Sequence, residues 1–128
     1  MKGVIPPVIF FALLMRRISN FPHFFFFLKE SNMRENRFQA NLKRELAEMF
    51  PGCFVFKLDP NDFQGIPDLL VIYKDKWAIL ECKRAPKANR QSNQGYYVDL
   101  FDRMSFARFI YPENKEEVLY ELQRAFES

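Results

Sequence analysis

The sequence predicts an α/β fold in which helices flank a mixed four-stranded sheet. Two apolar segments, 69–73 and 77–80, are separated by a short polar connection, which is typical of a β-hairpin. Segments with the 3.6-residue period of amphipathic helices stand on either side of this hairpin. At 128 residues the chain has room for one small domain with a modest core. The expected order of elements is α-β-β-β-α-β-α.

The strongest predicted helix covers 34–50 and ends at Pro51-Gly52. Four apolar residues fall at i, i+4, i+8 and i+11 and form one buried stripe, namely Phe38, Leu42, Leu46 and Met49. A first strand is expected over 53–58, where β-branched and aromatic residues gather. The turn-rich loop 59–65 then leads into the hairpin.

The second half of the chain predicts two more helices and one more strand. A helix is expected over 93–104, with a buried stripe formed by Tyr97, Leu100, Phe101 and Met104. A strand follows over 105–111 and ends at Pro112. A closing amphipathic helix over 114–126 is expected to direct inward Val118, Leu119, Leu122 and Phe126.

Three charged residues stand at the open end of the hairpin. Asp68 enters the first strand, and Glu81 and Lys83 leave the second, two residues apart and therefore on one face. Asp68 joins that face only if the numbers of opposed residues sum to an odd number. A two-residue turn at 74–75 gives this register and places Asp68 opposite Glu81. A slip of one residue would send Asp68 to the other side of the sheet. The alternative interpretation of these residues is a hairpin whose ends carry solvated charges.

Residues 1–32 differ from the rest of the chain. They carry the whole net charge of +3, so the remaining residues are neutral overall and give no global argument for nucleic-acid binding. Their apolar runs are shorter than a spanning helix needs. One interpretation is an N-terminal membrane anchor. We favour another: Lys29-Glu30 can be encoded as a ribosome-binding sequence, so 1–32 are translated upstream sequence and synthesis starts at Met33, with 33–128 as the functional domain.

Cysteine and histidine usage argues against a zinc site. Cys53 and Cys82 are the only cysteines, and His23 is the only histidine. We expect both cysteines to be reduced thiols of a cytoplasmic protein without stable membrane association. The chain also offers no His–Ser or His–Cys pair for nucleophilic catalysis.

Pro67-Asp68, followed after a hairpin by Glu81-Cys82-Lys83, resembles the PD-(D/E)XK nuclease superfamily. The segment Gly65-Ile66-Pro67-Asp68-Leu69, with Gln94 downstream, is most similar to its VRR-NUC branch, which includes small phage proteins that resemble Holliday-junction resolvases. The resemblance runs from about Arg34 to the C-terminus. It implies a restriction-endonuclease-like αβββαβ core, here followed by a C-terminal helix.

The resemblance also implies a site for Mg²⁺ or Mn²⁺. Asp68, Glu81 and the backbone carbonyl of Cys82 would hold the metal ion, since hard oxygen ligands suit both ions. Lys83 would orient or deprotonate the attacking water. Gln94 would help to position that water or the DNA.

An early-helix glutamate commonly completes this site in the resembled family. Glu35 is the candidate, because helical phase places it on the Phe38 side of the helix, whereas Glu45 lies at the edge of that face and Glu48 away from it. The alternative is a first-turn glutamate favoured by the helix dipole.

Further residues are candidates for contacts with nucleic acid. Gln39 lies near the same helix face, and Gln64 and Gly65 stand at the mouth of the site, where Gly65 permits an unusual backbone angle. The acid-free basic run after Glu81 suits phosphate contacts and holds Lys83, Arg84, Lys87 and Arg90. The alternative for this run is a solvated surface loop.

These expectations lead to a metal-dependent deoxyribonuclease that hydrolyses DNA phosphodiester bonds. A domain this small has little surface for base readout, so we expect cleavage specific for branched DNA, such as a Holliday junction, in phage or bacterial recombination, repair or replication. Paired cuts imply a homodimer. The alternatives are a non-catalytic nucleic-acid-binding protein that keeps the fold, and a sequence-specific restriction-type nuclease.

Overall fold

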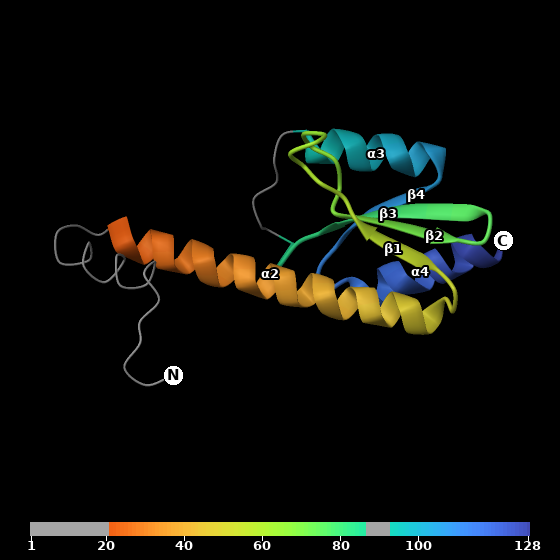
Figure 1. The fold of residues 1–128 in the computed structure, drawn as a ribbon, viewed down its shortest axis with the longest axis horizontal. Coiled ribbons are helices and arrows are strands. Elements are labelled where there is room, and N and C mark those ends of the chain that lie inside the picture. The colour runs from red at the N-terminus through yellow and green to blue at the C-terminus, as the bar shows by residue number, and fades with distance from the viewer. Residues whose placement is uncertain (1–20, 87–92) are drawn as a thin grey trace. The chain divides into compact units, whose positions relative to one another are not determined.

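The computed structural model describes residues 21–86 and 93–128, and the chain divides into two units, 1–36 and 37–128. The predicted order of elements is confirmed (Figure 1). The elements are α2 (Phe21–Met49), β1 (Phe54–Lys57), β2 (Leu69–Tyr73), β3 (Lys76–Cys82), α3 (Gln94–Met104), β4 (Phe106–Ile110) and α4 (Lys115–Glu127). Helix α2 crosses the boundary between the units, and the strands β1 to β4 belong to the second unit.

Helix α2 begins at Phe21, so the predicted start at Arg34 was wrong. Pro22 lies in the first turn, where its missing N–H has no intrahelical partner to lose. No glycine or further proline interrupts the helix as far as Met49, and the Ser31-Asn32 pair costs only about 0.5 kcal/mol per residue in helix propensity. That residues 1–32 are an extension before a true start at Met33 stays a prediction.

The sheet is mixed, as predicted. Its strand order is β1-β2-β3-β4, with β1, β2 and β3 antiparallel and with β3 and β4 parallel. A parallel pair needs a crossover connection, and α3 supplies it. Helix α3 lies on one face of the sheet, while α4 and residues 37–49 of α2 lie on the other (Figure 1).

The hairpin has the register that brings the charged residues together. Tyr73 pairs with Lys76 and Leu69 with Leu80, so opposed numbers sum to an odd value. The turn consists of two residues, and Lys74 adopts a φ of 58°. Continuing the same register by one residue places Asp68 opposite Glu81. The prediction for the favourable register is confirmed.

A core lies between the sheet and the helices α2 and α4. Leu42, Leu46 and Leu122 are fully buried within it, and each buried side chain of this size contributes about 1.5–3 kcal/mol. The predicted stripes of both helices are confirmed, with Phe38 and Met49 packed at the edge of the core.

A smaller core lies under α3 and is formed by Ile79, Val98 and Ala107. The predicted stripe of α3 was partly wrong. Met104 is 64% exposed, whereas Val98 is buried. The buried face of the helix is centred between Val98 and Phe101, which lie three residues apart, and Met104 falls at its edge in the last turn.

Two remaining expectations concern the cysteines and the membrane. Cys53 and Cys82 are free thiols. Burial raises the pKa of the Cys53 thiol, and a backbone hydrogen bond offsets part of the rise. Over the ranges 21–86 and 93–128, no helix combines the length and the apolar composition that a membrane span requires.

Candidate active site

Three predicted site residues lie on one face of the sheet, at one end of the hairpin. Residues alternate between the two faces of a strand, so Glu81 shares its face with Trp77 and Ile79, which pack toward α3. Asp68, opposite Glu81 in register, projects to the same face. Leu80 and Cys82 project to the other face and belong to the larger core. The charges therefore gather on the α3 side.

The Asp68 side chain is fixed by the neighbouring strand. The backbone N–H of Cys82 donates a hydrogen bond of 2.9 Å to Asp68 Oδ2. On the other side, the backbone carbonyl of Asp68 accepts a hydrogen bond of 2.8 Å from the N–H of Leu58. Asp68 is thus held between β3 and the end of β1, although it lies just before β2 itself.

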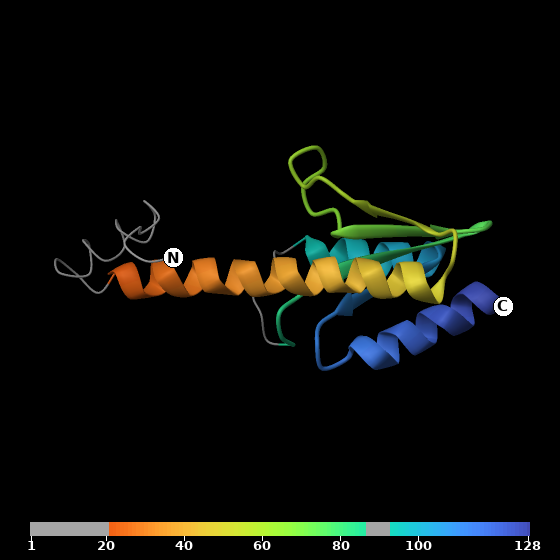
Figure 2. The same ribbon diagram turned by 60° about the horizontal axis from the view of Figure 1, so that its bottom comes forward.

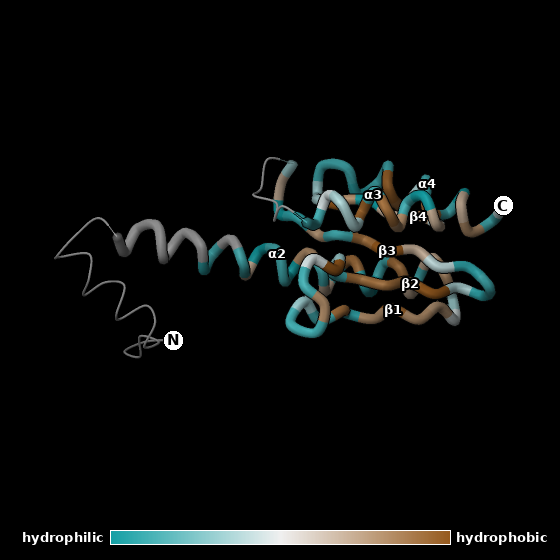
Figure 3. Tube along the Cα trace, turned by 90° about the horizontal axis from the view of Figure 1, so that it is seen from above, coloured by the Kyte–Doolittle hydropathy of each residue, from teal (hydrophilic) through white to brown (hydrophobic). Residues whose placement is uncertain are grey.

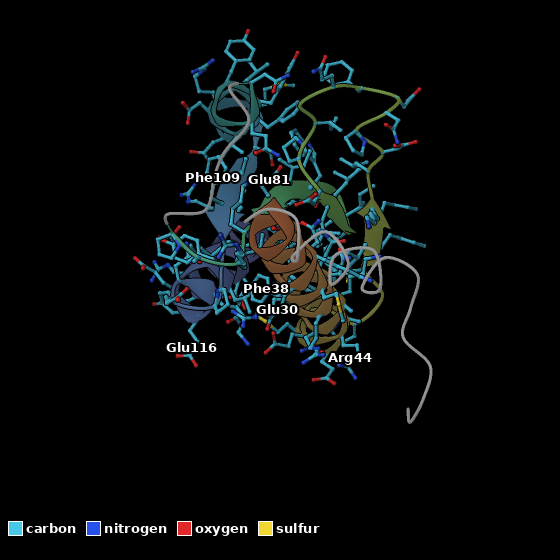
Figure 4. The ribbon with its side chains drawn as sticks, turned by 90° about the vertical axis from the view of Figure 1, so that its left-hand side faces the viewer. Glu30, Phe38, Arg44, Glu81, Phe109 and Glu116 are labelled. Carbon is cyan, nitrogen blue, oxygen red and sulfur yellow. The ribbon has the colours of Figure 1, made fainter. Side chains whose placement is uncertain are left out.

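Glu81 and Lys83 are buried, with 1% and 6% of their surfaces exposed. The backbone N–H of Lys83 donates a 2.8 Å hydrogen bond to the carbonyl of Ile110, which extends the β3–β4 ladder beyond the end of β3. Lys83 Nζ lies 4.0 Å from Glu81 Oε1. Figure 4 labels Glu81 and its register partner on β4, Phe109, at this end of the sheet.

Gln94 joins these two charges. Its Nε2 donates a hydrogen bond of 3.1 Å to Glu81 Oε1, and its Oε1 accepts one of 2.8 Å from Lys83 Nζ. An amide suits this position because one end donates and the other accepts. Gln94 is the first residue of α3, so the start of the crossover helix is anchored on the charged end of the hairpin. The structure thus brings Gln94 to Glu81 and Lys83, and its role in positioning the attacking water or the DNA stays a prediction.

The loop between β1 and β2 contacts the start of α3, and Figure 2 shows it projecting from the sheet. Gly65 has a φ of +88°, and a Cβ built on it would come within 2.5 Å of the Asn93 side chain. Asn93 Nδ2 donates a hydrogen bond of 3.4 Å to the Gln64 carbonyl. The backbone angle therefore favours glycine here, and any other residue would also have to displace the Asn93 side chain.

The remaining candidates for the metal site and for contacts with nucleic acid differ in where they lie. Gln39 is buried at 7% exposure, and Arg84 is half-buried. Glu35 is half-buried on α2 and belongs to the first unit, so its part in the site stays a prediction. Lys87 and Arg90 lie outside the described residues.

Sequence reasoning missed the contacts that hold the loop against α3. Phe63 and Tyr97 stack edge to face at 5.2 Å between ring centroids, and Asn93 joins the same contact region. These residues are about 30 positions apart in the chain, and no local pattern predicts such a pairing. A signal was available only at Gly65, whose placement before Pro67 indicated a constrained loop.

The donor set fits Mg²⁺ or Mn²⁺ better than a softer metal. No group of three or more Asp, Glu, His or Cys side chains in the described ranges is placed to hold a metal ion. Asp68 and Glu81 supply two carboxylates, and Mg²⁺ is commonly held by one or two carboxylates together with water and substrate phosphate. Two carboxylates beside one ammonium group leave a formal negative charge, which a cation would offset.

No protein-family model matches this sequence, and no curated protein matches it significantly. Among solved structures, one described as a VRR_NUC domain is similar to this chain, with a TM-score of 0.51 and 25% sequence identity. The similarity covers 61% of this chain and 83% of that domain. Together with the mixed four-stranded sheet and its helices, this likeness confirms the resemblance predicted from the sequence: the protein is VRR-NUC-like, with a restriction-endonuclease-like fold.

Proposed function

We propose that this protein is a divalent-metal-dependent nuclease of the PD-(D/E)XK type. The observation that carries the proposal is the hairpin register, which places two carboxylates, Asp68 and Glu81, opposite each other on one face beside Lys83. The likeness to a VRR_NUC domain supports a nuclease independently of these residues. A solvated strand end does not account for Glu81 and Lys83, which are almost fully buried.

Each residue has a proposed role. Asp68, Glu81 and the Cys82 carbonyl hold Mg²⁺ or Mn²⁺, with Glu35 as a further ligand. A bound ion of this kind lowers the pKa of a water molecule and offsets charge on a phosphate. Lys83 orients the attacking water and stabilises negative charge that develops on the phosphate. Gln94 holds the Lys83 ammonium and the Glu81 carboxylate in place from the start of α3.

The proposed substrate is DNA with branches or other departures from a regular duplex. The basic side chain of Arg84 directly follows the site, and phosphate contacts of this kind give affinity without sequence readout. A homodimer would supply two active sites for paired cuts on a junction. These statements about substrate and assembly rest on the resemblance and on the small size of the domain.

A cleavage panel tests the proposal. The purified chain is incubated in Mg²⁺, in Mn²⁺ and in EDTA with a four-way junction, a flap, linear duplex DNA, single-stranded DNA and RNA. We expect cleavage in either metal, none in EDTA, and the fastest cleavage on a branched DNA. Asp68→Asn serves as the matched inactive variant, and its loss of cleavage excludes a contaminating nuclease.

Two outcomes would count against the proposal. Full activity in EDTA would exclude a metal-dependent mechanism. DNA binding without cleavage of any substrate in either metal would favour the non-catalytic alternative, a nucleic-acid-binding protein that keeps the fold.

A further inference from the structure

Two phenylalanines on the edge strand β1 are exposed side by side. Phe54 is 61% exposed and Phe56 is 47% exposed. Their rings are stacked, with centroids 6.1 Å apart and planes within 8° of parallel. Because they are two residues apart on a strand, both project to the same face of the sheet. We call the surface formed by these two rings the Phe54–Phe56 face.

The Phe54–Phe56 face lies on the same side of the sheet as the candidate site. Phe56 is opposite Leu70, and Leu70 is opposite Ile79, which packs toward α3. The next row along the three strands holds Asp68 and Glu81. The exposed rings and the two carboxylates are therefore neighbours on one continuous face, and the rows of side chains lead from the rings to the site.

Helix α3 leaves this part of the face open. It packs against β3 and β4. Figure 3 looks onto the α3 side, where no helix from the described parts of the chain lies over β1 or β2. A strand of substrate that reaches Asp68 and Glu81 from the β1 edge would pass over the exposed rings.

The exposed area decides between two kinds of occupant. A fully exposed phenylalanine presents about 200 Å², so Phe54 and Phe56 together present about the same area at their observed exposures. A stable interface between two protein chains buries about 800 Å² on each partner. Two flat parallel rings are too small for a second copy of the chain but are sufficient for one or two nucleic-acid bases.

We propose that the Phe54–Phe56 face binds unpaired bases of the substrate by stacking and directs that strand toward the candidate site. Aromatic side chains on an open sheet surface stack bases in other nucleic-acid-binding folds. Bases in a duplex have no free ring face to offer, so this contact selects nucleic acid with unpaired nucleotides. The inference rests on the proposed function, because it names the class of substrate for the same site.

Binding measured without metal tests the inference separately from catalysis. Fluorescence anisotropy in EDTA would compare a labelled 20-mer of deoxythymidine with a 20-base-pair duplex. For Phe54→Ala/Phe56→Ala we expect about tenfold weaker binding of the single strand and less than about a twofold change for the duplex. Tyr120→Ala removes a ring of similar exposure from α4 and is the matched control, with no expected change.

Phe56→Leu and Phe56→Tyr identify the kind of contact. Leucine keeps apolar surface but lacks an aromatic ring, so Phe56→Leu is expected to weaken single-strand binding as Phe56→Ala does, whereas Phe56→Tyr retains it. Both side chains are exposed, so the melting temperature should stay within about 2 °C of the wild type. Wild-type affinity in Phe56→Leu would show plain apolar contact and overturn the stacking proposal.

Other outcomes also overturn it. One is single-strand binding that is undetectable in the wild type or unchanged in the double variant. Another is a wild-type dimer by light scattering that dissociates when both phenylalanines are replaced, since the face would then belong to a second copy. A different outcome separates the two proposals. If the wild type cleaves none of the substrates but binds single strands through the two phenylalanines, the nuclease function is contradicted and the stacking surface is not.

Discussion

The carboxylate of Asp68 is held by the backbone of Cys82, whose N–H donates a 2.9 Å hydrogen bond to Asp68 Oδ2. A carboxylate that stands before one strand is thus oriented by the next strand, opposite Glu81. The hairpin itself, rather than a flanking loop, sets the distance between the two acids. The Asp68 side chain therefore has two separable properties. Its oxygen accepts a hydrogen bond that stabilises the fold, and its negative charge belongs to the proposed metal site.

Two substitutions of Asp68 should therefore behave differently. Asp68→Ala removes the acceptor of the Cys82 N–H and should lower the free energy of unfolding by about 1–3 kcal/mol. Asp68→Asn keeps an amide oxygen that can accept the same hydrogen bond, so its stability should stay within about 0.5 kcal/mol of the wild type. Urea unfolding measures both values. Equal destabilisation by the two variants would contradict a role for this hydrogen bond.

Gln94 provides a second prediction. Gln94→Ala removes the donor to Glu81 and the acceptor of Lys83 at once. Partners that orient a site in this way contribute about 10–100-fold in activity, so single-turnover cleavage should slow by that factor while DNA affinity in EDTA is unchanged. Gln94→Asn, whose amide is one methylene shorter, should resemble the alanine variant. If Gln94 acts only in DNA binding, affinity falls and the cleavage rate at saturation does not.

The turn of the hairpin gives a third prediction. Lys74 adopts a φ of 58°, a conformation that costs an L-residue about 1–2 kcal/mol. Lys74→Gly removes that cost, but glycine loses more conformational entropy on folding, which offsets part of the gain. The free energy of unfolding should therefore rise by about 0.5–1 kcal/mol. Asp75→Gly, at the adjacent position without a positive φ, should instead destabilise the protein. Thermal unfolding distinguishes the two, and equal effects would exclude strain at Lys74.

Much of this hairpin was predictable from local pattern. Strand alternation predicts the hairpin but leaves two registers open, and the two-residue turn that the structure has selects the one that pairs Asp68 with Glu81. Gln94 was a candidate because the resembled family carries a glutamine after its Glu-x-Lys, whereas its contacts with Glu81 and Lys83 are known only from the structure. The contact of Asn93 with Gln64 was not predictable, since it depends on how the crossover helix packs on a distant loop. The start of α2 was missed because the apolar run 24–27 was assigned to an N-terminal extension, whereas the structure has it in the first turns of this helix.

Cys53 gives a prediction for pH. Burial raises the pKa of its thiol, so the native state holds the proton at pH values where the unfolded chain has lost it. The resulting contribution to stability is complete below the unfolded pKa and is lost as the pH rises through the folded value. Between about pH 8 and pH 10 the wild type should lose more free energy of unfolding than Cys53→Ala. Parallel pH profiles for the two proteins would contradict burial as the cause.

The most direct test of the central claim is the rate of Mg²⁺-dependent DNA cleavage by Glu81→Gln. Glutamine has nearly the same shape as glutamate and lacks only the negative charge, so the variant should fold as the wild type does. We expect its cleavage rate to fall by more than about 100-fold, beyond the usual effect of a residue that only supports a metal ligand. Glu113→Gln, an exposed position before α4, is the matched control and should cleave at the wild-type rate. A folded Glu81→Gln variant that cleaves within tenfold of the wild type would contradict the assignment of Asp68 and Glu81 as the metal-binding pair.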